Sequence, residues 1–448
     1  LPEGIESKML YSDIIHIAWP SLVELTLTQL ASMVDLMMVG QLGPWALTAV
    51  GLTTQPKFLL MTMFMAMNVG ATAMVARYKG AGNQKKADQV LRQALLMTFI
   101  LGCVFAVIGF IAAPWLIKFM GASEDHVLQG GVDYLRIQMI GLPGLALTST
   151  ITATLRGVGN SKTAMIYNAM ANIINVIFNY MLIYGNFGAP RMEVAGASLA
   201  TIIGQYCAMF MAFYAVMNGQ QYIILRFRDG FKPNKEEIKK IVDIGAPAMV
   251  EQVVMRIGLI IYTRTVAGLG TLPYAVHQVC LNIQSLSFMN GQAFAVSATS
   301  LTGQSLGKKR HDMAQAYTTR TRKLGMCVSI FLGVVFFFFG GQIVALYSGG
   351  DQSLVELGAV IMMFVVQPFQ SSQLILAGAL RGAGDTKVTA AITFITVLLV
   401  RPALAIFAIN VLGMGLEGAW YALVTDQILR SLLVLLRYNS GAWKRHTM

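Results

Sequence analysis

Long apolar runs recur along the whole chain, and they constrain its fold more than any other feature. Apolar residues make up 56% of the 448 positions and charged residues only 12%, unlike a soluble domain. Because about 20 apolar residues cross the hydrocarbon layer as a helix, we predict an all-α polytopic membrane protein with about twelve transmembrane helices. The expected spans are 11–39, 50–76, 91–117, 131–154, 163–185, 194–217, 238–266, 273–303, 315–346, 355–379, 388–411 and 416–437.

Basic residues concentrate in alternate loops between these spans, and this asymmetry predicts the orientation of the chain. A net charge of +12 would also suit a nucleic-acid-binding protein, but the loops on one side carry nearly all of the Lys and Arg. The opposite loops carry only Lys118 and Arg191. By the positive-inside rule, both termini are cytoplasmic. We therefore expect contact with membrane lipid and none with nucleic acid.

The second half of the sequence repeats the first. Pro20 and Glu24 of the first span match Pro247 and Glu251 of the seventh, a shift of 227 residues. Six spans in each half give two lobes that enter the membrane in the same direction, related by a pseudo-twofold axis along the membrane normal. The predicted division is an N-terminal lobe at 1–217, a cytoplasmic linker at 218–237 and a C-terminal lobe with a short tail at 238–448.

Asp35 places a carboxylate deep in the first span, where a charge is costly and usually functional. The second half has Tyr262 at the matching position, so the two lobes differ here. Glu24 lies on the same helical stripe, about 16 Å away along the axis, too far to share one proton with Asp35. Asp35 is therefore predicted to bind a proton or substrate; the alternative is a structural carboxylate bonded to neighbouring Asn or Tyr groups.

The fifth span carries an asparagine stripe on one helical face, consisting of Asn168, Asn172, Asn175 and Asn179. Lipid would not tolerate four amides, so this face is expected to turn toward other helices. There the amides can bond Asp35 in either protonation state. Interhelical hydrogen bonds that only hold the lobe together remain the alternative, and both can apply.

Flexible residues near the first two spans suggest the lining of an apolar cavity. Methionine is abundant there, and its thioether can adapt to ligands of different shape. We predict Met33, Met37, Met61 and Phe64 as lining residues, with packing or lipid contact as the other interpretation.

The second half is polar but poor in acids. Its candidate site residues are Glu251, Tyr262, Asn282 and Gln367. No acid occurs between Leu357 and Gly384. Three intramembrane cations need counter-charges, for which Glu251 and Asp426 are candidates that the sequence cannot pair; these cations are Arg256, Arg264 and Arg401.

A doubled loop motif makes the resemblance to a known family specific. Leu155–Lys162 reads LRGVGNSK and Leu380–Lys387 reads LRGAGDTK, and Pro20 precedes Asp35 by fifteen residues. With two six-span halves, the whole chain resembles the multidrug and toxic compound extrusion (MATE) family, most closely its DinF-like bacterial branch.

This resemblance implies a proton-coupled efflux protein of the bacterial inner membrane. The matching site residues are Asp35, Asn175, Asn179 and Thr201. Sodium-coupled relatives use carboxylates on the seventh and tenth helices, and Asn179 stands where some relatives have a second carboxylate. These departures weaken the sodium alternative, although Glu251 remains.

No catalytic or nucleotide-binding motif is present, so the chain is predicted not to be an enzyme. The nearest Gly-Lys element, Gly303–Lys309, is one residue short of a P-loop and lacks its Ser or Thr. We expect a monomeric antiporter that exports amphipathic, cationic compounds in exchange for protons, without a cofactor or metal. Protons either displace substrate from Asp35 directly or let the first helix bend at Pro20. A lipid-linked precursor flippase and an uncoupled channel are the alternatives.

Overall fold

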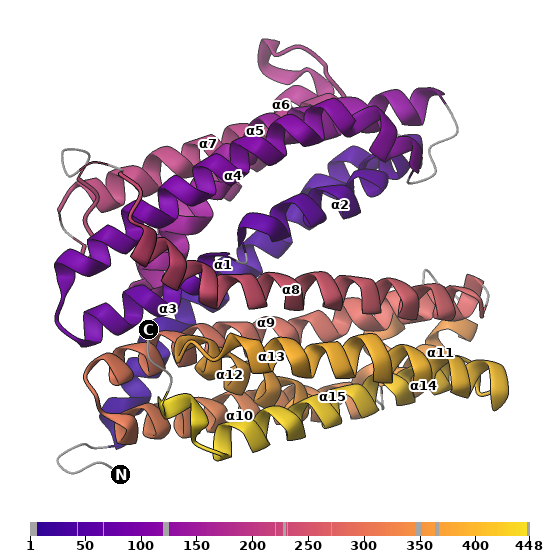
Figure 1. Ribbon diagram of the computed structural model, residues 1–448. Helices are drawn as coiled ribbons and strands as arrows, with labels where there is room; N and C mark the ends of the chain where they lie inside the picture. The colour runs from indigo at the N-terminus through magenta and orange to yellow at the C-terminus, as the bar shows by residue number, and fades with distance from the viewer. Residues whose placement is uncertain are drawn as a thin grey trace. The chain divides into compact units, whose positions relative to one another are not determined.

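The computed structural model of the protein describes residues 7–42, 44–65, 67–119, 125–219, 221–226, 230, 232–269, 271–345, 352–362 and 367–445. The side chains of some helical residues within these ranges, including Arg264, Asn282 and Gln367, lie outside the description. The described chain is helical and contains no β-strand, which confirms the predicted all-α fold (Figure 1).

The helices of the first half coincide with the six spans expected there. They are α1 (Ser7–Gly40), α2 (Pro44–Met65), α3 (Met67–Gly80), α4 (Gln84–Phe119), α5 (Asp125–Gly157), α6 (Ser161–Tyr184) and α7 (Val194–Met217). The second span comprises α2 and α3, which bend by 42° at a short break. Apolar length predicted the span, but it carries no information about such a bend.

The second half repeats this order. Its helices are α8 (Lys235–Ala267), α9 (Thr271–Gly307), α10 (His311–Ala345), α11 (Gln352–Met362), α12 (Gln367–Gly382), α13 (Thr386–Thr393), α14 (Arg401–Ile406) and α15 (Gly415–Asn439). Two π-helical segments, η3 (Phe394–Val400) and η4 (Phe407–Val411), interrupt the expected span at 388–411. By length and composition, eight described helices can cross a membrane, and a ninth span results if the bent pair counts as one.

The chain forms two compact units whose boundaries fall at matching places in the repeat. One unit comprises residues 19–245, and the other comprises residues 1–18 with 246–448. The divisions therefore come directly before Trp19-Pro20 and directly before Ala246-Pro247. The first turns of α1 therefore belong to the unit that holds the second half. The division into two lobes joined by a linker at 218–237, which the sequence repeat suggests, stays a prediction.

Within the unit formed by residues 19–245, long helices pack around an apolar core. Phe64, Ile117, Leu135 and Met139 are buried together there, from α2, α4 and α5. Helices α6 and α7 pack closely, and a Cβ on Gly204 would lie 3.0 Å from the Ala171 carbonyl oxygen. This close approach brings α6 and α7 to one side of the space in which the site lies.

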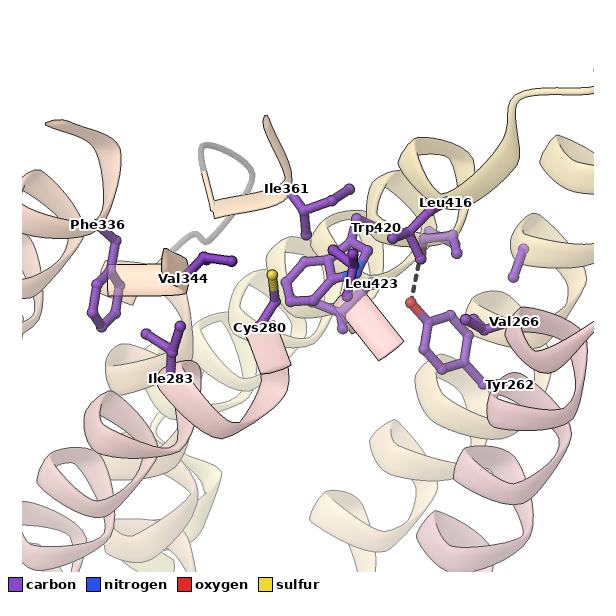
Figure 2. Close-up of a cluster of buried hydrophobic side chains, with 14 residues drawn as sticks. Tyr262, Val266, Cys280, Ile283, Phe336, Val344, Ile361, Leu416, Trp420 and Leu423 are labelled. Atoms are coloured by element: carbon purple, nitrogen blue, oxygen red, sulfur yellow. Dashed lines mark hydrogen bonds between the residues drawn. The ribbon is translucent and has the colours of Figure 1, made fainter. Parts of the chain in front are cut away.

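In the other unit, Tyr262 lies in a closed apolar core (Figure 2). Its hydroxyl donates a hydrogen bond to the Ala419 carbonyl oxygen at 2.8 Å. Nearby, the Trp420 ring nitrogen donates to Nδ1 of His277 at 3.1 Å. The position that matches Asp35 is thus filled by a packed aromatic ring and its satisfied hydroxyl.

Candidate functional site

A cavity of about 700 Å³ lies inside the unit formed by residues 19–245. Helices α1, α2, α5, α6 and α7 line it, with α3 contributing one residue. Four of the lining residues are charged, namely Glu24, Asp35, Lys57 and Arg156. The volume is that of a typical small-molecule site.

Asp35 is bound by the asparagine stripe of α6. Nδ2 of Asn175 donates to one carboxylate oxygen at 2.9 Å, and Nδ2 of Asn179 donates to the other. The carboxylate is half-buried at the cavity wall, and no cation within the described residues lies in ion-pair distance of it. Amide donors, rather than a positive charge, therefore hold Asp35.

The rest of the asparagine stripe bonds α1 in the same register. Asn168 donates to Glu24 at 2.8 Å, and Asn172 donates to the Thr28 hydroxyl at 3.3 Å. Partners on α1 and α6 follow each other in the same order, as they do for parallel helices. The amides of the stripe thus hydrogen-bond two helices to each other and also bond Asp35, so the structural and the site interpretation of the stripe apply together.

Arg156 closes the Glu24 end of the cavity. Its guanidinium lies 2.6 Å from a Glu24 carboxylate oxygen, so the first Arg of the doubled loop motif points into the site. In the other unit, the matching Arg381 lies 2.9 Å from Glu251, which also accepts a hydrogen bond from Thr393 at 3.0 Å. The repeat therefore duplicates a buried Glu–Arg ion pair.

Several predicted site residues meet at the cavity. Glu24, Asp35, Asn172, Asn175, Thr201 and Met61 line it, and Asn179 is buried directly behind Asp35. Pro20 is buried inside α1, which continues as a helix on both sides of it. Residues predicted from separate spans are thus brought to one place.

The structure corrects the lining prediction for three apolar residues. Met33 and Met37 are exposed and lie about 200° around α1 from Asp35, because each is two residues away from it on a 3.6-residue helix. Phe64 is fully buried in the apolar core, and Phe58 lines the cavity instead. Methionine abundance does not specify which helix face a side chain occupies.

Sequence reasoning missed Lys57 and the role of Arg156. Lys57 is a charge inside the expected span at 50–76, seven residues from its start, so the rule that selected Asp35 applied to it as well. Arg156 lies in the doubled loop motif on the basic side, where a Lys or Arg is expected from the orientation of the chain alone. Both signals were present in the sequence.

The candidates of the second half have other surroundings. Arg401 pairs with Asp426 at 2.6 Å, and Arg430 contacts the same carboxylate at 3.1 Å. Arg256 is not free either. Asn282, Gln367 and Arg264 lie outside the described side chains.

The comparisons with known proteins agree with this architecture. A probable multidrug resistance protein NorM of Thermotoga maritima is 27% identical, over 97% of this chain and 94% of that protein. An uncharacterized transporter, YisQ of Bacillus subtilis, is 25% identical over 96% of this chain and 94% of that one.

Solved structures share the fold. A crystal structure of MATE in the bent conformation superposes with a TM-score of 0.89 at 21% identity, over 99% of both chains. The outward-facing conformation of a multidrug resistance MATE family transporter also gives 0.89 at 21% identity, over 97% of this chain and 96% of that one.

The family model MatE matches residues 20–181 and 247–407, two segments that begin at the repeat-related Pro20 and Pro247. Since the model covers most of both halves, the chain is a multi-pass membrane protein that belongs to the MatE family, the multidrug and toxic compound extrusion family.

Proposed function

We propose that this protein is a secondary active multidrug efflux antiporter, which exports amphipathic, cationic compounds in exchange for protons. The observation that carries the proposal is the setting of Asp35 at the wall of a drug-sized cavity. Its carboxylate accepts hydrogen bonds from two amides, and no cation within the described residues forms an ion pair with it. Relatives named as multidrug resistance proteins support the export of drug-like compounds.

The amides suit a carboxylate that changes its protonation state. Ionised Asp35 accepts hydrogen bonds from Asn175 and Asn179, and it attracts a cationic group in the cavity. The amide oxygens of both residues are buried without a hydrogen-bond partner in the described structure, so either amide can turn its oxygen to Asp35 and accept a bond from the protonated carboxyl. Hydrogen bonding is thus available in both states, and protonation removes the attraction for the substrate cation.

The orientation follows from the charges of the loops. Both termini lie in the cytoplasm, the chain spans the bacterial inner membrane, and the monomer is the transporting unit. One charge that crosses a potential of 100 mV supplies about 2.3 kcal/mol, enough to drive accumulation of roughly fifty-fold. Protons are the proposed coupling ion, and the transporter uses no cofactor.

The test is transport of a fluorescent lipophilic cation in proteoliposomes, with proton and sodium gradients imposed separately. We expect the proton gradient alone to drive uptake, and Asp35→Asn to abolish this coupling while the protein still elutes as a folded species. Glu251→Gln is the matched carboxylate control in the other unit and should retain proton-driven transport. Full transport by Asp35→Asn would refute the assignment.

Sodium coupling has less support. Glu251, the remaining acid for a sodium site in the second half, is bonded to the Arg381 guanidinium and the Thr393 hydroxyl. The Arg381 guanidinium therefore already compensates the charge that a sodium ion would neutralise. Transport driven by a sodium gradient at equal pH, and lost in Glu251→Gln, would restore this alternative.

The flippase alternative also has less support. A lipid-linked pyrophosphate requires a strongly basic cavity, whereas the charged lining here consists of two acids and two bases. Arg401, one of the intramembrane cations of the second half, is buried against Asp426 and is not a free phosphate ligand. Loss of envelope-precursor export in a deletion strain, with drug tolerance unchanged, would favour the flippase.

A further inference from the structure

Lys57 is a charge inside the cavity that the proposed coupling does not use. It stands on α2 in a helix pair that is long and apolar enough to cross the membrane, and it lines the same cavity as Asp35. Within the described residues, no hydrogen bond or ion pair holds its ammonium group. An ammonium inside a membrane span is costly unless something compensates its charge.

The other charges of the cavity do not provide a direct partner. Glu24 and Arg156 are already paired with each other at 2.6 Å. Asp35 is near enough for its charge to act on Lys57, but its two oxygens accept hydrogen bonds from Asn175 and Asn179. The cavity therefore presents a separated negative and positive group, with no net charge in its lining.

We propose that Lys57 binds an acidic group of the substrate, so that among the cationic compounds it exports the transporter prefers amphipathic zwitterions to simple cations. The amine of the substrate lies toward Asp35 and its carboxylate toward Lys57. Phe58 and Met61, one position and one turn further along α2, supply apolar lining beside the ammonium. This inference rests on the proposed efflux function and defines its substrate class.

Charge balance explains why a zwitterion suits this site better than a cation. A monovalent cation bound at Asp35 would bring a second positive charge close to the Lys57 ammonium, in surroundings of low dielectric constant. A zwitterion satisfies both groups and leaves the cavity neutral. A hydrogen bond between two charged groups is strong enough for the carboxylate of the ligand to raise its binding affinity by about ten- to a hundred-fold.

The experiment compares two probes that differ only in this acid. Tetramethylrhodamine carries a carboxylate and a delocalised cation, and its methyl ester carries the cation alone. Their binding to the full-length purified protein is measured by fluorescence anisotropy. We expect the wild type to bind the acid at least ten-fold more tightly than the ester.

Substitutions at Lys57 then test whether this residue causes the preference for the acid over the ester. Lys57→Met should weaken binding of the acid by at least ten-fold without weakening that of the ester, and Lys57→Arg should keep the preference for the acid. Lys118→Met, an exposed lysine at the end of α4, is the matched control and should change neither affinity. Melting temperatures and gel-filtration profiles show whether each variant is folded.

Two results would overturn the proposal. One is a wild type that prefers the ester, with both affinities unchanged in Lys57→Met. The other is a Lys57→Met variant in which both affinities shift by the same factor, which would make Lys57 an internal counter-ion of Asp35. In either case, proton-driven transport of the ester that Asp35→Asn abolishes would leave the proposed efflux function standing.

Discussion

At the scale of single residues, the duplicated Glu–Arg pairs are expected to stabilise both units. Glu24 is buried against Arg156, and Glu251 is buried against Arg381. Removing one partner of a buried ion pair leaves the other charge uncompensated, which costs on the order of 3 kcal/mol. We therefore expect Arg156→Gln to lower the melting temperature of the purified protein.

A double-mutant cycle measures this coupling. The variant with both Glu24→Gln and Arg156→Gln should recover much of the lost stability, because two neutral amides can bond each other. The same cycle at Glu251 and Arg381 is the matched comparison in the other unit. Strictly additive effects in either cycle would mean that the pair contributes nothing as a pair.

The residues of the site were predictable to different degrees. Asp35 and the asparagine stripe could be found because helical periodicity and burial cost act within one span. That Asn175 and Asn179 belong with Asp35 came from the family resemblance, because the register between α1 and α6 cannot be read from the spans themselves. Lys57 could have been found by the rule applied to Asp35, whereas the outward direction of Met33 and Met37 depends on the phase of a helix that is apolar nearly all round.

At the scale of helices, the two repeats differ along the seam that matches α1 and α6. In the unit formed by residues 19–245, this seam consists of amides, hydroxyls and carboxylates beside a cavity. In the other unit, the backbones of α8 and η3 approach so closely that a Cβ on Gly258 would lie 2.5 Å from the Val397 carbonyl oxygen. Both seams thus keep a polar contact at the repeated Glu, since Thr393 donates to Glu251 in the second half, but only the seam of the first half has amides and a carboxylate beside a cavity further along.

Pro20 separates two parts of α1 that belong to different compact units, so we expect it to be the bending point. Proline supplies no N–H for the preceding turn, which makes the helix easy to bend there. Pro20→Ala restores this donor, and it should slow proton-driven transport several-fold while probe binding stays unchanged. Stopped-flow dye release from proteoliposomes measures the rate.

Pro247→Ala is the matched variant at the same place in the repeat. We expect a smaller effect on transport from it, because its helix carries Tyr262 instead of Asp35. Wild-type transport rates in Pro20→Ala would favour direct displacement of substrate by the proton and exclude bending as the coupling step.

At the scale of the whole molecule, the sequence predicted the architecture well because apolar length and an internal repeat are properties of the chain itself. The expected spans fall on helices of the described chain: the one at 50–76 on a bent pair, the one at 388–411 on a helix with π-helical segments, and the one at 355–379 on α11 and α12, between which residues 363–366 lie outside the description. The division into compact units was not predictable in the same way. It depends on which side chains bury the first turns of α1, and those partners lie some 300 residues further along the chain, at Leu301, Met313 and Tyr317.

These first turns are expected to stabilise the unit that holds the second half. Leu10, Ile14 and Ile17 are buried there, and the Tyr317 hydroxyl donates to Asp13 at 2.6 Å. Ile14→Ala creates a cavity in this packing and should destabilise the protein by about 2–4 kcal/mol. Ile15→Ala, at the next position but 48% exposed, should change stability by less than about 1 kcal/mol. Hydrogen exchange of the α10 amides around Tyr317 locates the effect: equal protection there in both variants would mean that the first turns of α1 do not support this unit.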